Sequence, residues 1–189
     1  MTLLYLVRHG QTEWSKSGQH TSFTDLDLTE HGVKQATALR ERLDPSEFGL
    51  VLTSPRTRAR HTAELAGFTD YEVTDDLQEW NYGDYEGKTS LEIREHHHPG
   101  WRLWFNGVPN GESAEQVRER VRREGVDLRG DRSLTLRYIP HNRAPLDKGR
   151  KEVLKHVHRL WGFDVMLEQQ NEDGSVELLE RCPPRMNGL

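Results

Sequence analysis

The sequence predicts an α/β fold, in which helices cover a mostly parallel sheet. The first observation is an apolar run, residues 3–7, that ends abruptly in Arg8-His9-Gly10. Consecutive apolar residues bounded by a glycine are typical of a strand buried on both faces, as in parallel sheets. The second observation is that two later apolar segments, 50–52 and 71–73, alternate with stretches of helical periodicity. Strands that alternate with helices indicate parallel pairing through right-handed crossovers.

Composition excludes several classes of protein. The chain has 189 residues, enough for one core-bearing domain or for a domain with a small appendage. A net charge of -5 argues against a nucleic acid or an anionic membrane as partner. The single cysteine, Cys182, cannot form an internal disulfide, and the apolar start is too short to span a bilayer. We therefore expect a cytoplasmic protein.

The turn after the first strand carries groups that suit anion chemistry. Ligands of open α/β sheets bind at the carboxyl ends of the strands. A histidine there acts as nucleophile or base, an arginine holds an anion, and a glycine admits close backbone approach. A strand that simply ends in a polar turn is the alternative. We expect residues 11–22 to form a loop over the strand end, with hydroxyls that bind phosphate or sugar or only stabilise turns.

Two helices are expected next. Thr29 caps a helix from Glu30 to Leu43, with its apolar face formed by Val33, Ala36, Leu39 and Leu43. After the 50–52 strand, Ser54 is the expected N-cap and Pro55 the first residue of a helix that runs to Ala66 before Gly67.

The second helix starts with a cluster of arginines, Arg56, Arg58 and Arg60. Positive side chains near a helix N-terminus oppose the macrodipole, which suggests a bound anion. We expect one of the three to point into a pocket. A solvated basic face is the alternative.

An acidic, aromatic segment follows the 71–73 strand. Residues 77–87 could hold a carboxyl in a partly apolar wall, which raises its pKa as a general acid requires, or could be a solvated loop. His96-His97-His98 does not predict a metal site, because three adjacent histidines cannot converge on one ion. Gly111-Glu112-Ser113 is expected to open a helix that runs to about Glu124, with Ser113 as N-cap.

Together these motifs resemble the histidine phosphatase superfamily, which includes the cofactor-dependent phosphoglycerate mutases. The resemblance implies a three-layer, phosphoglycerate mutase-like fold with helices on both faces of a mostly parallel sheet. It covers residues 1–125, and the stretches 8–21 and 79–87 resemble especially the sedoheptulose-bisphosphatase-like branch, whose substrates are sugar phosphates. The matching motifs are Arg8-His9-Gly10, Ser54-Pro55-Arg56-Thr57-Arg58-Ala59, Glu79-Trp80-Asn81-Tyr82-Gly83 and Gly111-Glu112-Ser113.

The resemblance implies a role for each matching residue. His9 would accept the phosphoryl group, while Arg8 and Arg58 would bind its oxygens and neutralise charge in the transition state. Glu79 would protonate the leaving alkoxide and then help to activate water. The partner would be a small phosphorylated substrate or inorganic phosphate, and no metal or other cofactor is implied because the arginines supply positive charge. The residues that fall where the family contacts phosphate or substrate are Ser15, Thr21, Ser22 and Tyr82.

The family also has a second histidine, in a Ser-His-Gly turn after a late strand, and this sequence lacks that motif. Residues 126–189 instead resemble, from about Gly130, the carboxyl-terminal end of the sporulation stage V protein R-like family. We therefore suspect a chain of two origins, natural or engineered, with a junction near residues 125–130; a diverged tail is the alternative. The resemblance rests on Leu134-Thr135-Leu136-Arg137-Tyr138, Pro140-His141-Asn142 and residues 153–163.

The tail has its own α+β pattern. A strand is expected at 134–139, an amphipathic helix at 150–161, and a hairpin formed by 163–169 and 175–179. The strand either inserts into the main sheet or packs beside it. An incomplete sheet would leave an unpaired edge, which favours a homodimer or aggregation. His141 follows the strand, so it either replaces the missing histidine or, as we favour, is a loop histidine of the second family.

Three functions remain open at this point. The first is a phosphomonoesterase that works through phosphohistidine, with mutase activity as a variant of it. The second is a phosphate-binding or regulatory module without catalysis, because half of the pocket could be missing. The third is an interaction fragment supplied by the carboxyl-terminal family, with the phosphatase part as its carrier.

Overall fold

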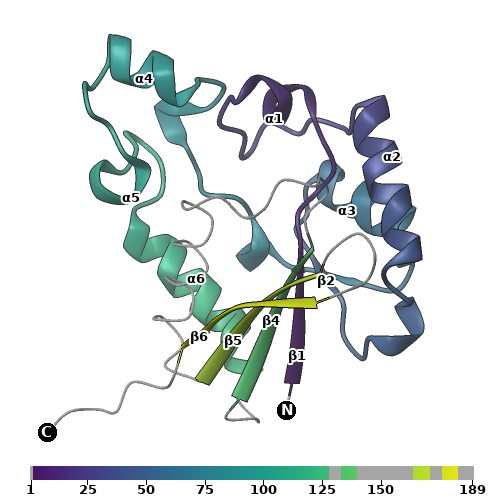
Figure 1. The fold of residues 1–189 in the computed structure, drawn as a ribbon. Helices are drawn as coiled ribbons and strands as arrows, with labels where there is room; N and C mark the ends of the chain where they lie inside the picture. The colour runs from purple at the N-terminus through teal and green to yellow at the C-terminus, as the bar shows by residue number, and fades with distance from the viewer. Residues whose placement is uncertain (1, 128–132, 140–163, 171–175, 183–189) are drawn as a thin grey trace, which may run out of the picture. The chain divides into compact units, whose positions relative to one another are not determined.

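The computed structural model describes residues 2–127, 133–139, 164–170 and 176–182. The chain forms two compact units (Figure 1). One consists of Met1–Arg8 with Arg122–Leu189, and the other of His9–Val121. Each unit is described by itself. In the described residues no helix is both long and apolar enough to cross a membrane.

The first unit contains a four-stranded sheet in the order β1-β4-β5-β6 (Figure 1). Strand β1 (Thr2–Val7) pairs in parallel with β4 (Ser133–Ile139), in a register that sets Val7 opposite Ile139. Strand β4 pairs in parallel with β5 (Asp164–Gln170). The predicted tail strand therefore inserts beside the first strand of the chain.

The last two strands form the predicted hairpin. Strand β5 pairs antiparallel with β6 (Val176–Cys182), with a register irregularity between Leu167 and Glu168. Both strands begin one residue later than expected, and β6 extends past residue 179. The sheet is thus mostly parallel with one antiparallel edge strand, which is common in α/β folds. The helix expected at 150–161 lies outside the described residues.

The second unit begins with two capped helices. Residues 11–22 are not entirely a loop, because Thr12 caps a short helix α1 (Glu13–Ser17). Thr29 caps α2 (Glu30–Ala38) as predicted, with Thr29 Oγ1 accepting from the Gly32 amide at 3.0 Å. The helix ends earlier than predicted and continues as the 3-10 turn η1 (Leu39–Glu41), and a second 3-10 turn, η2 (Pro45–Glu47), follows. Three of the four expected apolar residues are buried, namely Ala36, Leu39 and Leu43.

The next strand and helix differ from prediction at their ends. Strand β2 (Leu52–Thr53) pairs in parallel with β3 (Glu72–Val73) in a separate two-stranded sheet. Helix α3 (Thr57–Leu65) begins two residues after Pro55, so Ser54 is not its N-cap. The reason is distant in sequence: Asp25 Oδ1 accepts from the first helical amide, that of Thr57, at 2.8 Å. Gly67, with φ +98°, ends the helix as predicted.

The remaining elements of the second unit pack around an aromatic core. Tyr85, Ile93 and Trp101 are buried together, with Leu103 and Val108 packed against them. Ser113 caps the last helix as predicted, because Ser113 Oγ accepts from the Gln116 amide at 3.2 Å. These elements are η3 (Asp75–Leu77), η4 (Gly83–Tyr85), α4 (Ser90–His96), α5 (Leu103–Asn106) and α6 (Ala114–Asp127), of which the part up to Val121 belongs to this unit.

Candidate active site

The His9–Gly10 turn is fastened to helix α3. The Gly10 amide donates to Thr62 Oγ1 at 3.0 Å, and the same hydroxyl donates to the carbonyl of Arg58 at 2.7 Å. A Cβ on Gly10 would lie 2.4 Å from the carbonyl oxygen of Gly32, so only glycine fits there. The turn is therefore held to α3 through the side chain of Thr62 and packs closely against the backbone of α2 at Gly32.

The ring of His9 is oriented by its own turn. Its Nδ1 lies 2.7 Å from the carbonyl oxygen of Gly10. A carbonyl oxygen only accepts hydrogen bonds, so Nδ1 must donate. In neutral imidazole the proton on Nδ1 leaves a lone pair on Nε2. The structure thus selects the tautomer in which Nε2 is the nucleophilic nitrogen.

Arg58 is the one buried residue of the arginine cluster, with 3% of its surface exposed. Its Nη1 donates to the Thr24 carbonyl at 3.1 Å, and its Nη2 donates to the carbonyls of Ser22 at 3.0 Å and Thr21 at 3.4 Å. A guanidinium has five N–H groups, and the three bonds found among the described residues leave two of them available to an anion. Burial lowers the pKa of Arg58, and the charge of Glu79 opposes that shift. Even so, a guanidinium stays protonated in proteins.

A carboxylate holds the far side of the same loop. Glu86 Oε1 accepts from the amides of Ser22 at 2.8 Å and Thr24 at 3.1 Å. Residues 21–24 therefore lie between the carboxylate of Glu86 and the guanidinium of Arg58, and both groups bind their backbone. The hydroxyl of Ser22 is buried and has no hydrogen-bond partner within the described part of the chain. Sequence reasoning missed Glu86, because a backbone-binding acid leaves no local pattern.

The other two arginines are placed differently. Arg56 is partly buried, lies over the ring of Phe23 at 4.5 Å and donates to Gln78 Oε1 at 2.6 Å. Arg60 is exposed. The hydrogen bond from Arg56 to Gln78 joins the start of α3 to the segment that carries Glu79.

Glu79 lies at the surface, in agreement with the solvated-loop alternative for residues 77–87 and not with the apolar wall. Its Oε1 accepts from the Trp80 amide at 2.8 Å, and the hydroxyl of Tyr82 lies 3.5 Å away. Trp80 and Tyr82 are buried on the chain beside it, so the apolar residues of this segment form core and leave the carboxyl exposed. Glu79 and Arg58 are close enough for the carboxylate to affect the pKa of the guanidinium.

The residues expected to contact substrate make different contacts within the protein. Ser15 belongs to the capping box of α1, since its amide donates to Thr12 Oγ1 and its Oγ accepts from the Thr12 amide. Thr21 and Ser22 supply carbonyls to Arg58. Tyr82 stacks against His20, with ring centroids 4.5 Å apart.

His20 is a residue of this region that sequence reasoning missed. Its Nε2 lies 3.1 Å from Ser90 Oγ, and its ring also meets the edge of Trp101 at 5.4 Å. Burial lowers the pKa of His20, and the nearby charge of Glu86 partly offsets that effect. No motif marked it, because its surroundings come from segments about 60 to 80 residues further along the chain.

The roles of all the expected site residues stay predictions, and for Arg8 and His141 the structure also gives no placement beside the others. Arg8 is exposed and ends one unit, whereas His9 begins the other. His141 lies outside the described residues. The strand before it, β4, does lie beside β1, which is the condition for His141 to replace the missing histidine.

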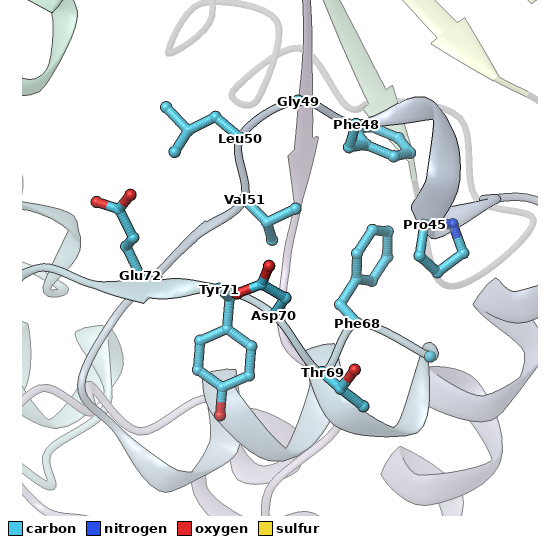
Figure 2. A pocket seen from close by; sticks show the side chains of 11 residues that line it. Pro45, Phe48, Gly49, Leu50, Val51, Phe68, Thr69, Asp70, Tyr71 and Glu72 are labelled. Atoms are coloured by element: carbon cyan, nitrogen blue, oxygen red, sulfur yellow. The ribbon is translucent and has the colours of Figure 1, made fainter.

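A pocket of about 220 Å³ is lined by none of these residues (Figure 2). It is formed by residues 45–51 and 67–72, and the rings of Phe48 and Phe68 meet edge to face in its wall. It is smaller than the pockets of about 300–1,000 Å³ that hold small molecules. In the described part of the chain no group of three His, Cys, Asp or Glu side chains could hold a metal ion.

Comparison with family models identifies both parts of the chain. Residues 4–131 match the histidine phosphatase superfamily (branch 1). Residues 124–172 match the SpoVR-like C-terminal domain. The two matches overlap at 124–131, in the region where the sequence suggested a junction.

Several known proteins match long stretches of the chain. The uncharacterized protein YcgB of Escherichia coli is 56% identical over 126 residues, which are 66% of this chain and 25% of that protein. An acid phosphatase of Mycobacterium tuberculosis is 47% identical over 120 residues, 62% of this chain and 59% of that one. Sedoheptulose 1,7-bisphosphatase of Saccharomyces cerevisiae is 41% identical over 141 residues, 62% of this chain and 52% of that one. The chain thus spans between a quarter and three fifths of these relatives.

Solved structures support the fold. The product of open reading frame Rv3214 of Mycobacterium tuberculosis aligns with a TM-score of 0.59 at 45% identity, covering 67% of this chain and 65% of that one. Phosphoglycerate mutase of Thermus thermophilus aligns with a TM-score of 0.51 at 32% identity, covering 72% and 75%. The fold is therefore α/β and phosphoglycerate mutase-like, as predicted.

Proposed function

Because the chain belongs to the histidine phosphatase superfamily, we propose that it is a phosphomonoesterase that works through a phosphohistidine on His9. The observation that carries the proposal is the hydrogen bond from His9 Nδ1 to the Gly10 carbonyl, which leaves the lone pair on Nε2. Its turn is also fastened to the helix that carries the buried Arg58. A nucleophile and an anion holder thus share one rigid support.

The proposed reaction has two steps. In the first, His9 Nε2 attacks phosphorus, the phosphorus–oxygen bond to the substrate breaks, and the leaving alkoxide takes a proton from Glu79. In the second, water attacks the phosphohistidine and gives its proton to Glu79, which releases inorganic phosphate and restores His9. Arg58, together with Arg8, stabilises the phosphoryl oxygens, because electrostatic stabilisation dominates phosphoryl transfer.

The surface position of Glu79 is compatible with this role. A general acid must reach the leaving oxygen, and geometry decides this before the pKa does. The second step requires the proton to return to the same oxygen atoms.

The substrate class follows from the relatives. Proteins named as an acid phosphatase and as sedoheptulose 1,7-bisphosphatase match over about two thirds of this chain, which supports small phosphorylated metabolites with sugar phosphates among them. A relative named as a phosphoglycerate mutase supports phosphoryl transfer between substrates as the second candidate. The two differ in whether water or a second hydroxyl takes the phosphoryl group.

We also propose a test of His141 as the second histidine. Strand β4 pairs with β1 so that Val7 stands opposite Ile139. His9 and His141 each follow those paired residues by two positions in the sequence.

The decisive experiment traps the intermediate. The full chain is mixed with a 32P-labelled sugar phosphate, quenched in alkali because phosphohistidine is acid-labile, and the labelled peptide is mapped. We expect the label on His9 and its loss in His9→Ala, with full labelling in His31→Ala as the control on exposed helix surface. Turnover that survives His9→Ala would refute the mechanism, and a protein that binds vanadate without turnover would be a phosphate-binding module. An unchanged rate in His141→Ala would dismiss the replacement.

A further inference from the structure

We propose that the ion pair of Glu112 and Arg120 is a positioning device that holds Glu79 in place for proton transfer. The inference rests on the proposed function, because it explains what holds Glu79, the general acid of the proposed reaction, in place. Neither residue is expected to touch the substrate. Both act through the backbone on either side of Glu79.

Arg120 holds the segment before Glu79. It is buried, and its Nη1 donates to the carbonyls of Asp76 at 2.9 Å and Gln78 at 2.6 Å. Backbone carbonyls that bind a guanidinium make charge-assisted hydrogen bonds, which are stronger than neutral ones. The residue immediately before Glu79 is therefore fixed by the strongest kind of hydrogen bond available to it.

Glu112 holds the segment after Glu79. Its Oε2 accepts from the Asn81 amide at 2.8 Å, and its carbonyl accepts from Trp80 Nε1 at 2.8 Å. The Glu112 amide in turn donates to the Asn81 carbonyl at 3.0 Å. Asn81 is thus bound through both backbone groups to one residue, Glu112.

The two halves are joined by a fork-to-fork ion pair. Arg120 Nε donates to Glu112 Oε1 at 2.8 Å and Arg120 Nη2 donates to Glu112 Oε2 at 3.0 Å. A bidentate pair of this kind fixes orientation as well as distance. The carbonyl of Gln78 and the amide of Asn81 are therefore held by one planar unit.

Glu79 depends on this unit because its side chain is held otherwise by its own segment, in which the hydroxyl of Tyr82 lies 3.5 Å from Glu79 Oε1. Glu79 is exposed, and its carboxyl is bound by its neighbour's amide, that of Trp80, at 2.8 Å. An exposed carboxyl that is not packed into a wall takes its position from the backbone that carries it. A displacement of about 1 Å in a catalytic group can cost about 100-fold in rate.

The test separates proton transfer from general damage by the choice of leaving group. An alkyl phosphate needs a general acid, because alkoxide is a poor leaving group, whereas p-nitrophenyl phosphate releases a stable phenolate that hardly needs one. We measure kcat/KM, which reports the phosphorylation step, for both substrates with Glu112→Gln and Arg120→Lys. We expect a fall of about tenfold or more for the alkyl phosphate and a much smaller one for the aryl phosphate.

Controls come from the same helix and from Glu79 itself. Glu115 and Arg118 form an exposed ion pair one turn away, so Glu115→Gln should leave both rates unchanged. Glu79→Gln removes the acid itself, so it sets the largest difference that can be expected between the losses in kcat/KM for the alkyl and the aryl phosphate. Circular dichroism melting checks that each variant is folded. If Glu112→Gln is not folded, the test uses Arg120→Lys, which keeps the positive charge.

Each remaining outcome overturns a stated claim. Equal losses for the two substrates, or no loss in either, would show that the ion pair has only a structural role and overturn the positioning proposal. A wild type without turnover would overturn the proposed function. A Glu79→Gln variant that loses equal rate with the alkyl and the aryl phosphate would overturn Glu79 as the general acid. Either result would overturn the positioning role as well. The two failures are distinguished by the behaviour of the wild type and of Glu79→Gln.

Discussion

The amide of Gly10 donates a hydrogen bond to the hydroxyl of Thr62, at a distance of 3.0 Å. The two residues are 52 positions apart, and both are buried. The same hydroxyl donates a hydrogen bond to the carbonyl of Arg58, so it serves as acceptor for one partner and donor to the other. One side chain thus fastens the turn of the proposed nucleophile to the helix of the proposed anion holder.

Replacing Thr62 with valine should therefore weaken both stability and catalysis. Valine has the same shape but cannot accept from Gly10, so a buried amide loses its partner. An unsatisfied buried group costs about 1–3 kcal/mol in the free energy of unfolding. We expect a loss in that range by urea denaturation, together with at least a tenfold fall in kcat for phosphate ester hydrolysis.

The controls for this change are conservative. Thr62→Ser keeps the hydroxyl and should retain most of the activity, while Thr37→Val replaces an exposed threonine of α2 and should have little effect. A Thr62→Val protein that is as stable as Thr37→Val would show that Gly10 finds another partner.

Gly32→Ala should destabilise the protein although alanine is the better helix former. Helix propensity favours alanine over glycine by about 1 kcal/mol in a helix interior. The new Cβ, however, would lie 2.2 Å from the carbonyl oxygen of Gln11, and backbone cannot move aside as a flexible side chain does. Overpacking costs about 1–3 kcal/mol, so the clash outweighs the gain.

The measurement is the free energy of unfolding of Gly32→Ala beside that of Gly49→Ala. Gly49 has open space where the Cβ would stand, so it reports what the extra methyl does without a clash. If both variants are equally stable, the turn has room to yield, and α2 does not hold the His9–Gly10 turn as closely as the distances imply.

The ion pair of Glu112 makes a prediction about acid. Burial raises the pKa of Glu112, but the hydrogen bonds from Arg120 and Asn81 and the charge of Arg120 outweigh it, so the pKa lies below 4.5. A carboxyl with a lowered folded pKa stabilises the protein above its unfolded pKa and loses that effect as the pH falls through the folded value.

Glu112→Gln should consequently differ from the wild type most at neutral pH. We expect the difference in melting temperature to be constant above about pH 5 and to shrink as the pH is lowered towards 3. Glu115→Gln, in an exposed pair, gives the reference curve. A difference that stays constant down to pH 3 would mean that Glu112 stabilises the protein without its charge.

Sequence reasoning was most successful where structure is local. The Thr29 and Ser113 caps and the Gly67 stop depend on residues within three or four positions, and all three are confirmed. The start of α3 failed for the opposite reason: Asp25, more than 30 residues earlier, accepts from the Thr57 amide and replaces the predicted cap Ser54.

The site shows the same limit. The motifs identified Arg58 and Glu79, but not the groups that hold them. Glu86 accepts from the amides of Ser22 and Thr24, which lie 64 and 62 residues earlier in the loop that binds Arg58. Arg120 donates to the Gln78 carbonyl, 42 residues earlier. Backbone atoms carry no sequence signature, so contacts to them are invisible before the fold is known. For the segment of Glu79 the sequence left a partly apolar wall and a solvated loop open, and the structure has the carboxyl exposed because its aromatic neighbours Trp80 and Tyr82 turn into the core.

The last prediction concerns His20, which lies against Tyr82. Burial lowers the pKa of His20 below 6.5, and Glu86 offsets only part of the shift. The unfolded chain therefore binds more protons than the folded one just below pH 6.5, so this residue costs stability as the pH falls. We expect the His20 ring protons to titrate below pH 6.5 by NMR, with the resonance assigned by its loss in His20→Gln. A second measurement follows the melting temperature as the pH is lowered from about 7 to 5. We expect the melting temperature of the wild type to fall more steeply over this range than that of His20→Gln. Parallel curves would mean that the attraction of Glu86 cancels the effect of burial, and a midpoint above 6.5 would mean that it outweighs it.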